Sequence, residues 1–179
     1  MASRVVIKLG GGLITDKGSM KKFDSESVQR VVESISLVVE IGVPIIIVHG
    51  AGSFGHLLAK EWSISDGLDQ KIAEEQRMIV KEIRSDMREL NRLIVTRLAE
   101  LGLEAEALPP SEWAIGTGPK FQGEIINFQR EVEEPIPIAF GDVVNTNDEL
   151  EFGILSGDDL MLRLSRELEV SHCIFLIGD

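Results

Sequence analysis

The sequence predicts an α/β fold, a three-layer αβα sandwich in which helices cover both faces of a mainly parallel central sheet. Short apolar segments typical of strands alternate along the chain with longer segments of helical spacing, and this alternation favours parallel strands joined by crossover helices. Two strand-like segments also end in closely spaced glycines, at residues 10–12 and 50–55. Ligands of open α/β sheets bind at the carboxyl ends of the strands. We treat residues 1–179 as a single domain.

The first quarter of the chain predicts a strand, a helix and a second strand. Residues 4–9 are apolar apart from the two basic positions and lead into the first glycine turn. A helix follows, because Asp24 or Ser25 can cap it and the next valines and isoleucines lie on one helical face. Gly42 ends this helix, and the apolar run at residues 44–48 forms the second strand.

Helical spacing dominates the next part of the chain. A short helix is expected over residues 55–61, and a long one from Leu68 to Leu101, ended by Gly102. At about 1.5 Å per residue the long helix would span roughly 50 Å, so we expect a kink or break in it. It is predicted to pack in the core and can also wall an apolar pocket through one or more of four side chains. These are Met78, Ile79, Ile83 and Met87.

A third strand is expected over residues 104–108. The two prolines that follow end it, and Ser111 can cap a single helical turn. Residues 116–134 show no clear periodicity, so we expect a loop or hairpin that passes over the sheet edge. Residues 136–140 are again strand-like.

The last part of the chain predicts a hairpin, a helix and a final strand. Residues 143–144 and 152–154 flank a turn, which indicates a hairpin. A helix begins at residues 156–159, and residues 172–177 form the final strand. Because Cys173 lies inside this apolar run, we predict a buried core residue rather than a nucleophile.

Composition excludes several classes of protein. Acidic residues number 30 against 18 basic ones, for a formal net charge of −12, and the chain has no basic patch of the kind that binds nucleic acid. No apolar stretch approaches the ~18 residues of a membrane helix, and the first strand begins too early to leave room for a signal peptide. A single cysteine excludes an intramolecular disulfide. We therefore expect a soluble cytoplasmic protein.

The loop at residues 49–56 has the sequence His-Gly-Ala-Gly-Ser-Phe-Gly-His and directly follows the second predicted strand. Closely spaced glycines allow backbone N–H groups to approach an anion, so phosphate is the first ligand to consider. The loop also matches the Gly-x-Gly-x-x-Gly pattern of dinucleotide-binding proteins. That interpretation is disfavoured. The dinucleotide motif should be followed by a strand that ends in an acidic residue about 20 positions later, whereas the acidic residues in that region of this chain lead into a long helix. The Walker pattern is absent.

Five side chains are candidates for chemistry at this edge. Lys8 stands in an apolar strand just before the first glycines and can face phosphate, although a lysine at a strand end can also reach solvent. Lys17 is a weaker second cation. Asp158 either caps a helix or orients the lysines. His56 ends the glycine loop and can donate a hydrogen bond to phosphate, whereas His49 precedes the loop and is expected to support it from behind.

Together these segments resemble the amino-acid kinase superfamily, and most closely its isopentenyl phosphate kinase branch. The segments that carry the resemblance are residues 8–17, 49–56, 141–144 and 154–160. Their order and spacing match over nearly all 179 residues. His56 is the discriminating residue, because a histidine at this point of the loop marks kinases whose acceptor is a phosphate or phosphonate.

The resemblance implies transfer of the γ-phosphoryl group of ATP to isopentenyl phosphate, which yields isopentenyl diphosphate. It implies that Mg²⁺ arrives with ATP and that the protein itself contributes no metal ligand. The implied catalytic residues are Lys8, Lys17, His56 and Asp158. The implied ATP-binding residues are Lys8, Gly10, Gly11, Gly12, Gly52 and Asp179, and those that hold the acceptor phosphate are Ala51, Gly52, His56 and Gly157. Within these sets, Lys17 would stabilise the transferred group and Asp158 would orient the lysines.

Two departures from the family pattern limit this expectation. Gly12 replaces a usual serine, which removes one hydroxyl near the phosphates. Family members are also longer, and their additional segment supplies the nucleotide-base pocket and a further lysine. We therefore expect the chain to hold the acceptor lobe and part of the phosphate site, with an incomplete C-terminal side, and to be weakly active or inactive alone. A homodimer is expected from the family.

Two other functions stay open at this point. The same fold with a histidine in this loop also serves kinases for phosphonates such as fosfomycin. Alternatively, the chain is a noncatalytic binding or assembly subunit. A dehydrogenase is the weakest of the alternative functions, because only the dinucleotide pattern supports it.

Overall fold

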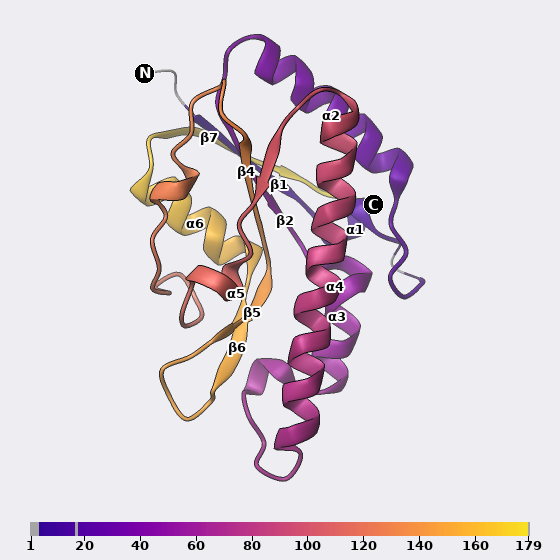
Figure 1. Cartoon of the computed structure of the whole chain (residues 1–179), viewed down its shortest axis with the longest axis vertical. Helices are drawn as coiled ribbons and strands as arrows, with labels where there is room; N and C mark the ends of the chain where they lie inside the picture. Colours follow the sequence, from indigo (N-terminus) through magenta and orange to yellow (C-terminus); the bar gives the residue numbers. More distant parts are fainter. Residues whose placement is uncertain (1–3, 17, 179) are drawn as a thin grey trace.

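The computed structural model describes residues 4–16 and 18–178, and its core is a five-stranded parallel sheet (Figure 1). The strand order is β3-β4-β2-β1-β7, and every neighbouring pair is parallel. The strands are β1 (Arg4–Leu9), β2 (Ile45–His49), β3 (Ala105–Ala107), β4 (Ile136–Phe140) and β7 (Val170–Leu176). Two further strands, β5 (Asp142–Asn145) and β6 (Phe152–Leu155), form an antiparallel hairpin after β4. The predicted parallel sheet and the predicted hairpin are both confirmed.

Helices cover both faces of this sheet, as the sandwich prediction requires (Figure 1). One face carries α2 (Ser25–Glu40), α3 (Gly52–Glu61) and α4 (Ala73–Glu100), and the other carries α5 (Pro110–Trp113) and α6 (Gly157–Glu167). The short elements are α1 (Gly11–Ile14) and two 3₁₀ turns, η1 (Ile64–Asp66) and η2 (Ile126–Phe128). None of the helices within residues 4–16 and 18–178 combines the length and apolar character needed to cross a membrane.

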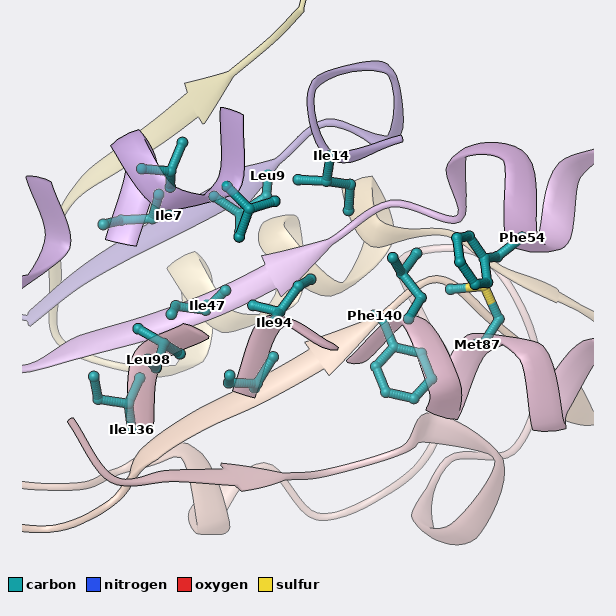
Figure 2. Close-up of a cluster of buried hydrophobic side chains, with 14 of the residues drawn as sticks. Ile7, Leu9, Ile14, Ile47, Phe54, Met87, Ile94, Leu98, Ile136 and Phe140 are labelled. Carbon is teal, nitrogen blue, oxygen red and sulfur yellow. The ribbon is translucent and has the colours of Figure 1, made fainter. Parts of the chain in front are cut away.

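The two faces of the central strands explain why their sequences are almost continuously apolar. Successive side chains of a strand point to opposite faces. Ile7 and Ile47 therefore pack with α2 and α4, while Val6 and Ile46 pack with α6. Figure 2 shows the larger cluster, in which Leu98 of α4 lies close to the sheet. Strands buried on both faces have continuously apolar sequences, in which apolar and polar residues do not alternate.

Several helix boundaries differ from the sequence prediction. The helix α4 runs for 28 residues without a break, so of the predicted kink or break the break is wrong. It starts at Ala73 and not at Leu68, because the segment before it is hydrogen-bonded to another part of the chain. The N–H of Leu68 donates to the carbonyl oxygen of Leu150 at 3.0 Å, which holds that segment against the tip of the β5–β6 hairpin. The N-terminal cap of α2 is Asp24, whose side chain accepts from the N–H of Ser27, as predicted.

Ser111 is not a cap, contrary to the prediction. The turn α5 starts two residues earlier than predicted, at Pro110 with Pro109 at the cap position, because a proline suits the first turn of a helix. The N–H of Ser111 instead donates to the Asp142 carboxylate at 3.0 Å. Asp158 is not a cap either, since Ser156 caps α6 by accepting from the N–H of Asp159.

The prediction of a buried Cys173 is wrong, because this thiol is exposed. The strand β7 lies at one edge of the sheet and pairs with β1. Its middle residues are exposed, including Ile174 and Phe175. An apolar run therefore identified the strand correctly, but its place at the edge decided the burial.

Candidate functional site

A cavity of about 580 Å³ opens at the carboxyl ends of β1 and β2, where the sequence predicted a ligand site. Both glycine segments line it, together with the start of α6 and side chains of α3, α4 and the β5–β6 hairpin. Because β1 and β2 are parallel neighbours, their carboxyl ends lie at the same edge of the sheet. The cavity therefore combines segments that are far apart in the sequence.

The two glycine segments are packed backbone against backbone. A Cβ atom on Gly11 would lie 2.4 Å from the nitrogen of Gly52, and one on Gly50 would lie 2.8 Å from the nitrogen of Gly11. Gly52 also has a positive φ of 49°, a conformation that glycine adopts at little cost. Side chains at these positions would push the segments apart. The glycines are therefore required by this close approach as well as by access for a ligand.

Three helices start at this cavity, and the N–H groups of a first helical turn have no acceptor inside their own helix. The N–H groups of Gly11, Ala51, Gly52 and Gly157 donate to no acceptor among residues 4–16 and 18–178. The neighbouring N–H of Ser53 is already satisfied, since it donates to the hydroxyl of Thr15 at 2.9 Å. Unpaired N–H groups at helix starts attract anions, so this end of the cavity is suited to phosphate.

Lys8 supplies a cation at the same end. Its ammonium group forms an ion pair with Asp158, and its side chain is 18% exposed against 69% for Asp158. The ammonium also lies 5.9 Å from the centre of the Phe175 ring. The cation is therefore held at this end of the cavity, between β1 and the start of α6, by its ion pair with Asp158.

His56 lines the cavity from the second turn of α3 and is exposed to solvent. Next to it Gly55 is buried, and a Cβ there would lie 2.9 Å from the sulfur of Met87. The close packing of α3 on α4 brings the exposed imidazole to the same cavity as the buried side chains of Ile83 and Met87. Of the four α4 side chains considered, Ile83 and Met87 line the cavity, whereas Met78 is 70% exposed.

The rest of the cavity wall is mostly apolar. Its apolar side chains are Leu57, Ala59, Ile83, Met87, Val143 and Ile154. A ligand that fits both parts has an anionic head for the N–H groups and Lys8, and a small apolar tail for this wall.

The amino acid kinase family model matches residues 3–178. The chain belongs to the amino acid kinase family. Relatives named isopentenyl phosphate kinase include those of Thermoplasma acidophilum, 27% identical over 173 residues, and Methanothermobacter thermautotrophicus, 29% identical over 169 residues. These matches cover 96% and 92% of this chain, but 66% and 63% of the two relatives. The chain thus spans about two thirds of the length of these curated relatives.

Solved structures agree with this relationship. An X-ray structure of isopentenyl phosphate kinase superposes with a TM-score of 0.90 at 27% identity, covering 98% of this chain and 72% of that one. An isopentenyl phosphate kinase substrate complex superposes with a TM-score of 0.84 at 25% identity, covering 99% of this chain and 70% of that one. Over the described residues, the fold of this chain is therefore that of isopentenyl phosphate kinases.

The structure brings nearly all the predicted site residues of this chain together. Those that line the cavity are Lys8, Gly10, Gly11, Gly12, Ala51, Gly52, His56, Gly157 and Asp158. Lys17 and Asp179, also predicted, lie outside the described residues. The individual roles of all these residues stay predictions.

Two polar residues of the site were not singled out from the sequence. The Thr15 hydroxyl donates to the carbonyl oxygen of Gly11 at 2.8 Å and so links both glycine segments through Ser53. Asp142 lines the cavity but is almost completely buried, and burial raises the pKa of its carboxyl group. Thr15 carries no signal in the sequence, because its role depends on a contact across 38 residues. Asp142 has a weak signal, an acidic residue directly after a strand and a glycine.

Proposed function

We propose that this chain provides the acceptor site of an ATP-dependent kinase that phosphorylates isopentenyl phosphate to isopentenyl diphosphate. The observation that carries the proposal is the division of one cavity into an anion-binding end and an apolar end. Isopentenyl phosphate has a phosphate head and a short branched hydrocarbon tail, and these match the two ends in order. The family and the relatives named above support the same reaction.

The proposed roles combine the pattern of the family with the geometry of the cavity. Lys8 and the N–H groups of the Gly11 turn would face the phosphates of ATP, with Asp158 holding the lysine in place. His56 and the N–H groups of Ala51 and Gly157 would hold the acceptor phosphate. An ionised phosphate monoester is already a nucleophile at neutral pH, so His56 needs only to donate a hydrogen bond. Catalysis would then consist of positioning and charge neutralisation, as in other phosphoryl transfers.

Mg²⁺ enters this proposal as part of the substrate MgATP. Across the described part of the chain, no group of three or more His, Cys, Asp or Glu side chains is arranged to hold a metal ion. The metal would instead arrive with ATP and reduce the mutual repulsion of the phosphates. We also propose a homodimer and a cytoplasmic location, the latter supported by the single cysteine of the chain.

A substrate panel tests the proposal. The chain is assayed with MgATP and isopentenyl phosphate, with fosfomycin, and with no acceptor, and binding of each acceptor is measured by calorimetry. We expect isopentenyl phosphate to bind most tightly. Preference for fosfomycin would favour the phosphonate kinase, and binding of neither acceptor would favour a noncatalytic subunit.

The variant His56→Ala tests the assigned role of the imidazole. Loss of one hydrogen bond to a charged phosphate is expected to raise the Kd for isopentenyl phosphate about tenfold or more, with little change in the Kd for MgATP. His172→Ala is the matched control, because His172 is exposed on β7 and does not line the cavity. Equal acceptor affinity in the two variants would remove the role given to His56.

A further inference from the structure

His49 is a completely buried histidine behind the glycine segment that lines the cavity. It is the last residue of β2, and its ring stacks on Phe140 with the ring centres 4.9 Å apart. Its Nδ1 atom lies 2.9 Å from the carbonyl oxygen of Gly50, and its Nε2 atom lies 3.3 Å from the side-chain oxygen of Asn91 on α4. Asn91 is also buried. A buried polar pair of this kind, outside the cavity but against its wall, needs a physical explanation.

The protonation state of the ring follows from its surroundings. Burial lowers the pKa of His49 to about 4, so the imidazole is neutral at physiological pH and has one N–H. The shorter contact, to Gly50, requires that Nδ1 carry the proton, because two lone pairs at 2.9 Å would repel. Nε2 then accepts a hydrogen bond from the Asn91 amide, whose NH₂ reaches it after a half-turn of the amide.

This hydrogen bond controls the orientation of one peptide group. In a trans peptide the C=O and the following N–H point in opposite directions. When the Gly50 carbonyl faces the buried imidazole, the Ala51 N–H faces the other way. Ala51 lines the cavity, and its N–H donates to no acceptor that the structure describes.

We propose that His49 is a positioning residue that, supported by Asn91, holds the Gly50 carbonyl inward and thereby aims the Ala51 N–H at the acceptor phosphate. The identity of that acceptor rests on the proposed function, whereas the orientation of the peptide group does not. His49 touches no ligand in this proposal, so its effect is on the binding of the phosphate group through the backbone.

Three substitutions separate this role from a general contribution to packing. The amide nitrogen of an asparagine at position 49 can take the place of Nδ1, so His49→Asn keeps a donor for Gly50. The amide of a glutamine reaches to the place of Nε2, so His49→Gln keeps the contact with Asn91 and loses the one with Gly50. His49→Phe keeps an aromatic ring on Phe140 and loses both hydrogen bonds.

Two readouts are made on each variant: the Kd for isopentenyl phosphate, by calorimetry, and the shift of the Ala51 amide resonance on titration with inorganic phosphate, by NMR. We expect His49→Asn to stay within about threefold of the parent Kd. His49→Gln and His49→Phe are expected to raise the Kd about tenfold, the effect of one misdirected hydrogen bond, and to reduce the Ala51 shift. Leu98→Val is the control for lost stability, because Leu98 is buried in the core and does not line the cavity.

The outcomes are decisive in each case. An unchanged Kd in His49→Phe, or equal Kd values in His49→Asn and His49→Gln, would overturn the proposal. A rise of the same size in Leu98→Val would also overturn it, because the effect would then reflect stability alone. If His49→Phe does not fold, the comparison of the asparagine and glutamine variants decides. If the parent binds phosphate but not isopentenyl phosphate, the proposed function fails, and the Ala51 resonance still tests the positioning role.

Discussion

The substitution Gly11→Ala tests the close packing of the two glycine segments. An alanine Cβ at this position would lie 2.4 Å from the nitrogen of Gly52 and 2.7 Å from its Cα. Both contacts are with backbone atoms, so no side chain can move aside, and the segments must separate by about 1 Å to reach ordinary contact at 3.4 Å. Displacement of this size among substrate-positioning groups reduces rates about 100-fold. Overpacking of this kind costs about 1–3 kcal/mol of stability.

The assay is kcat/KM for isopentenyl phosphate with MgATP, at enzyme concentrations high enough to follow a weakly active parent, together with urea unfolding. The control is Gly102→Ala, at the end of α4, where an added Cβ meets nothing within 4 Å but φ is +76°. This variant is expected to lose about 1–2 kcal/mol through backbone strain alone. It should retain its activity. The reasoning is refuted if Gly11→Ala keeps parental kcat/KM, or if Gly102→Ala loses as much activity.

Three further predictions follow from the ionisable groups. Asp158→Asn should reduce activity about tenfold by releasing Lys8, while the midpoint of urea unfolding moves little, because the Asp158 side chain is 69% exposed; a large loss of stability with full activity would contradict this. Burial lowers the pKa of His49 to about 4. The neutral ring therefore contributes about 3 kcal/mol to the free energy of unfolding above pH 6.5, and this contribution is lost as the pH falls toward 4. The free energy of unfolding of His49→Phe should lack this acid dependence. The pKa of Lys21 is raised, chiefly by its ion pair with the Asp86 carboxylate at 2.8 Å. The stability from this pair is complete below pH 10.5 and is lost as the pH rises above it, so the free energy of unfolding of Asp86→Asn should fall less steeply between pH 9 and 12.

Local pattern was sufficient for most of the fold. The bounds of β1 and β4 match the prediction, because strands buried on both faces need continuous apolar runs. The start of α2 was predicted from Asp24, which caps it. The start of α4 was misplaced, since the pairing of Leu68 with Leu150 is a contact between distant segments. The turn α5 was misplaced although its proline is a local signal, and the acceptor of the Ser111 N–H, the Asp142 carboxylate, lies in a distant segment.

The candidate site divides in the same way. The sequence by itself determined that glycine segments follow two strands and that Lys8, His56 and Asp158 accompany them, because glycine spacing and charges in apolar runs are local signals. Only the tertiary structure decided that the glycine segments touch through their backbones and that the rest of the cavity wall is mostly apolar. It also decided that His49 is buried and bound to Gly50, and that Cys173 is exposed at the sheet edge. These properties depend on distances between residues far apart in the chain, and a pattern along the chain does not contain such distances.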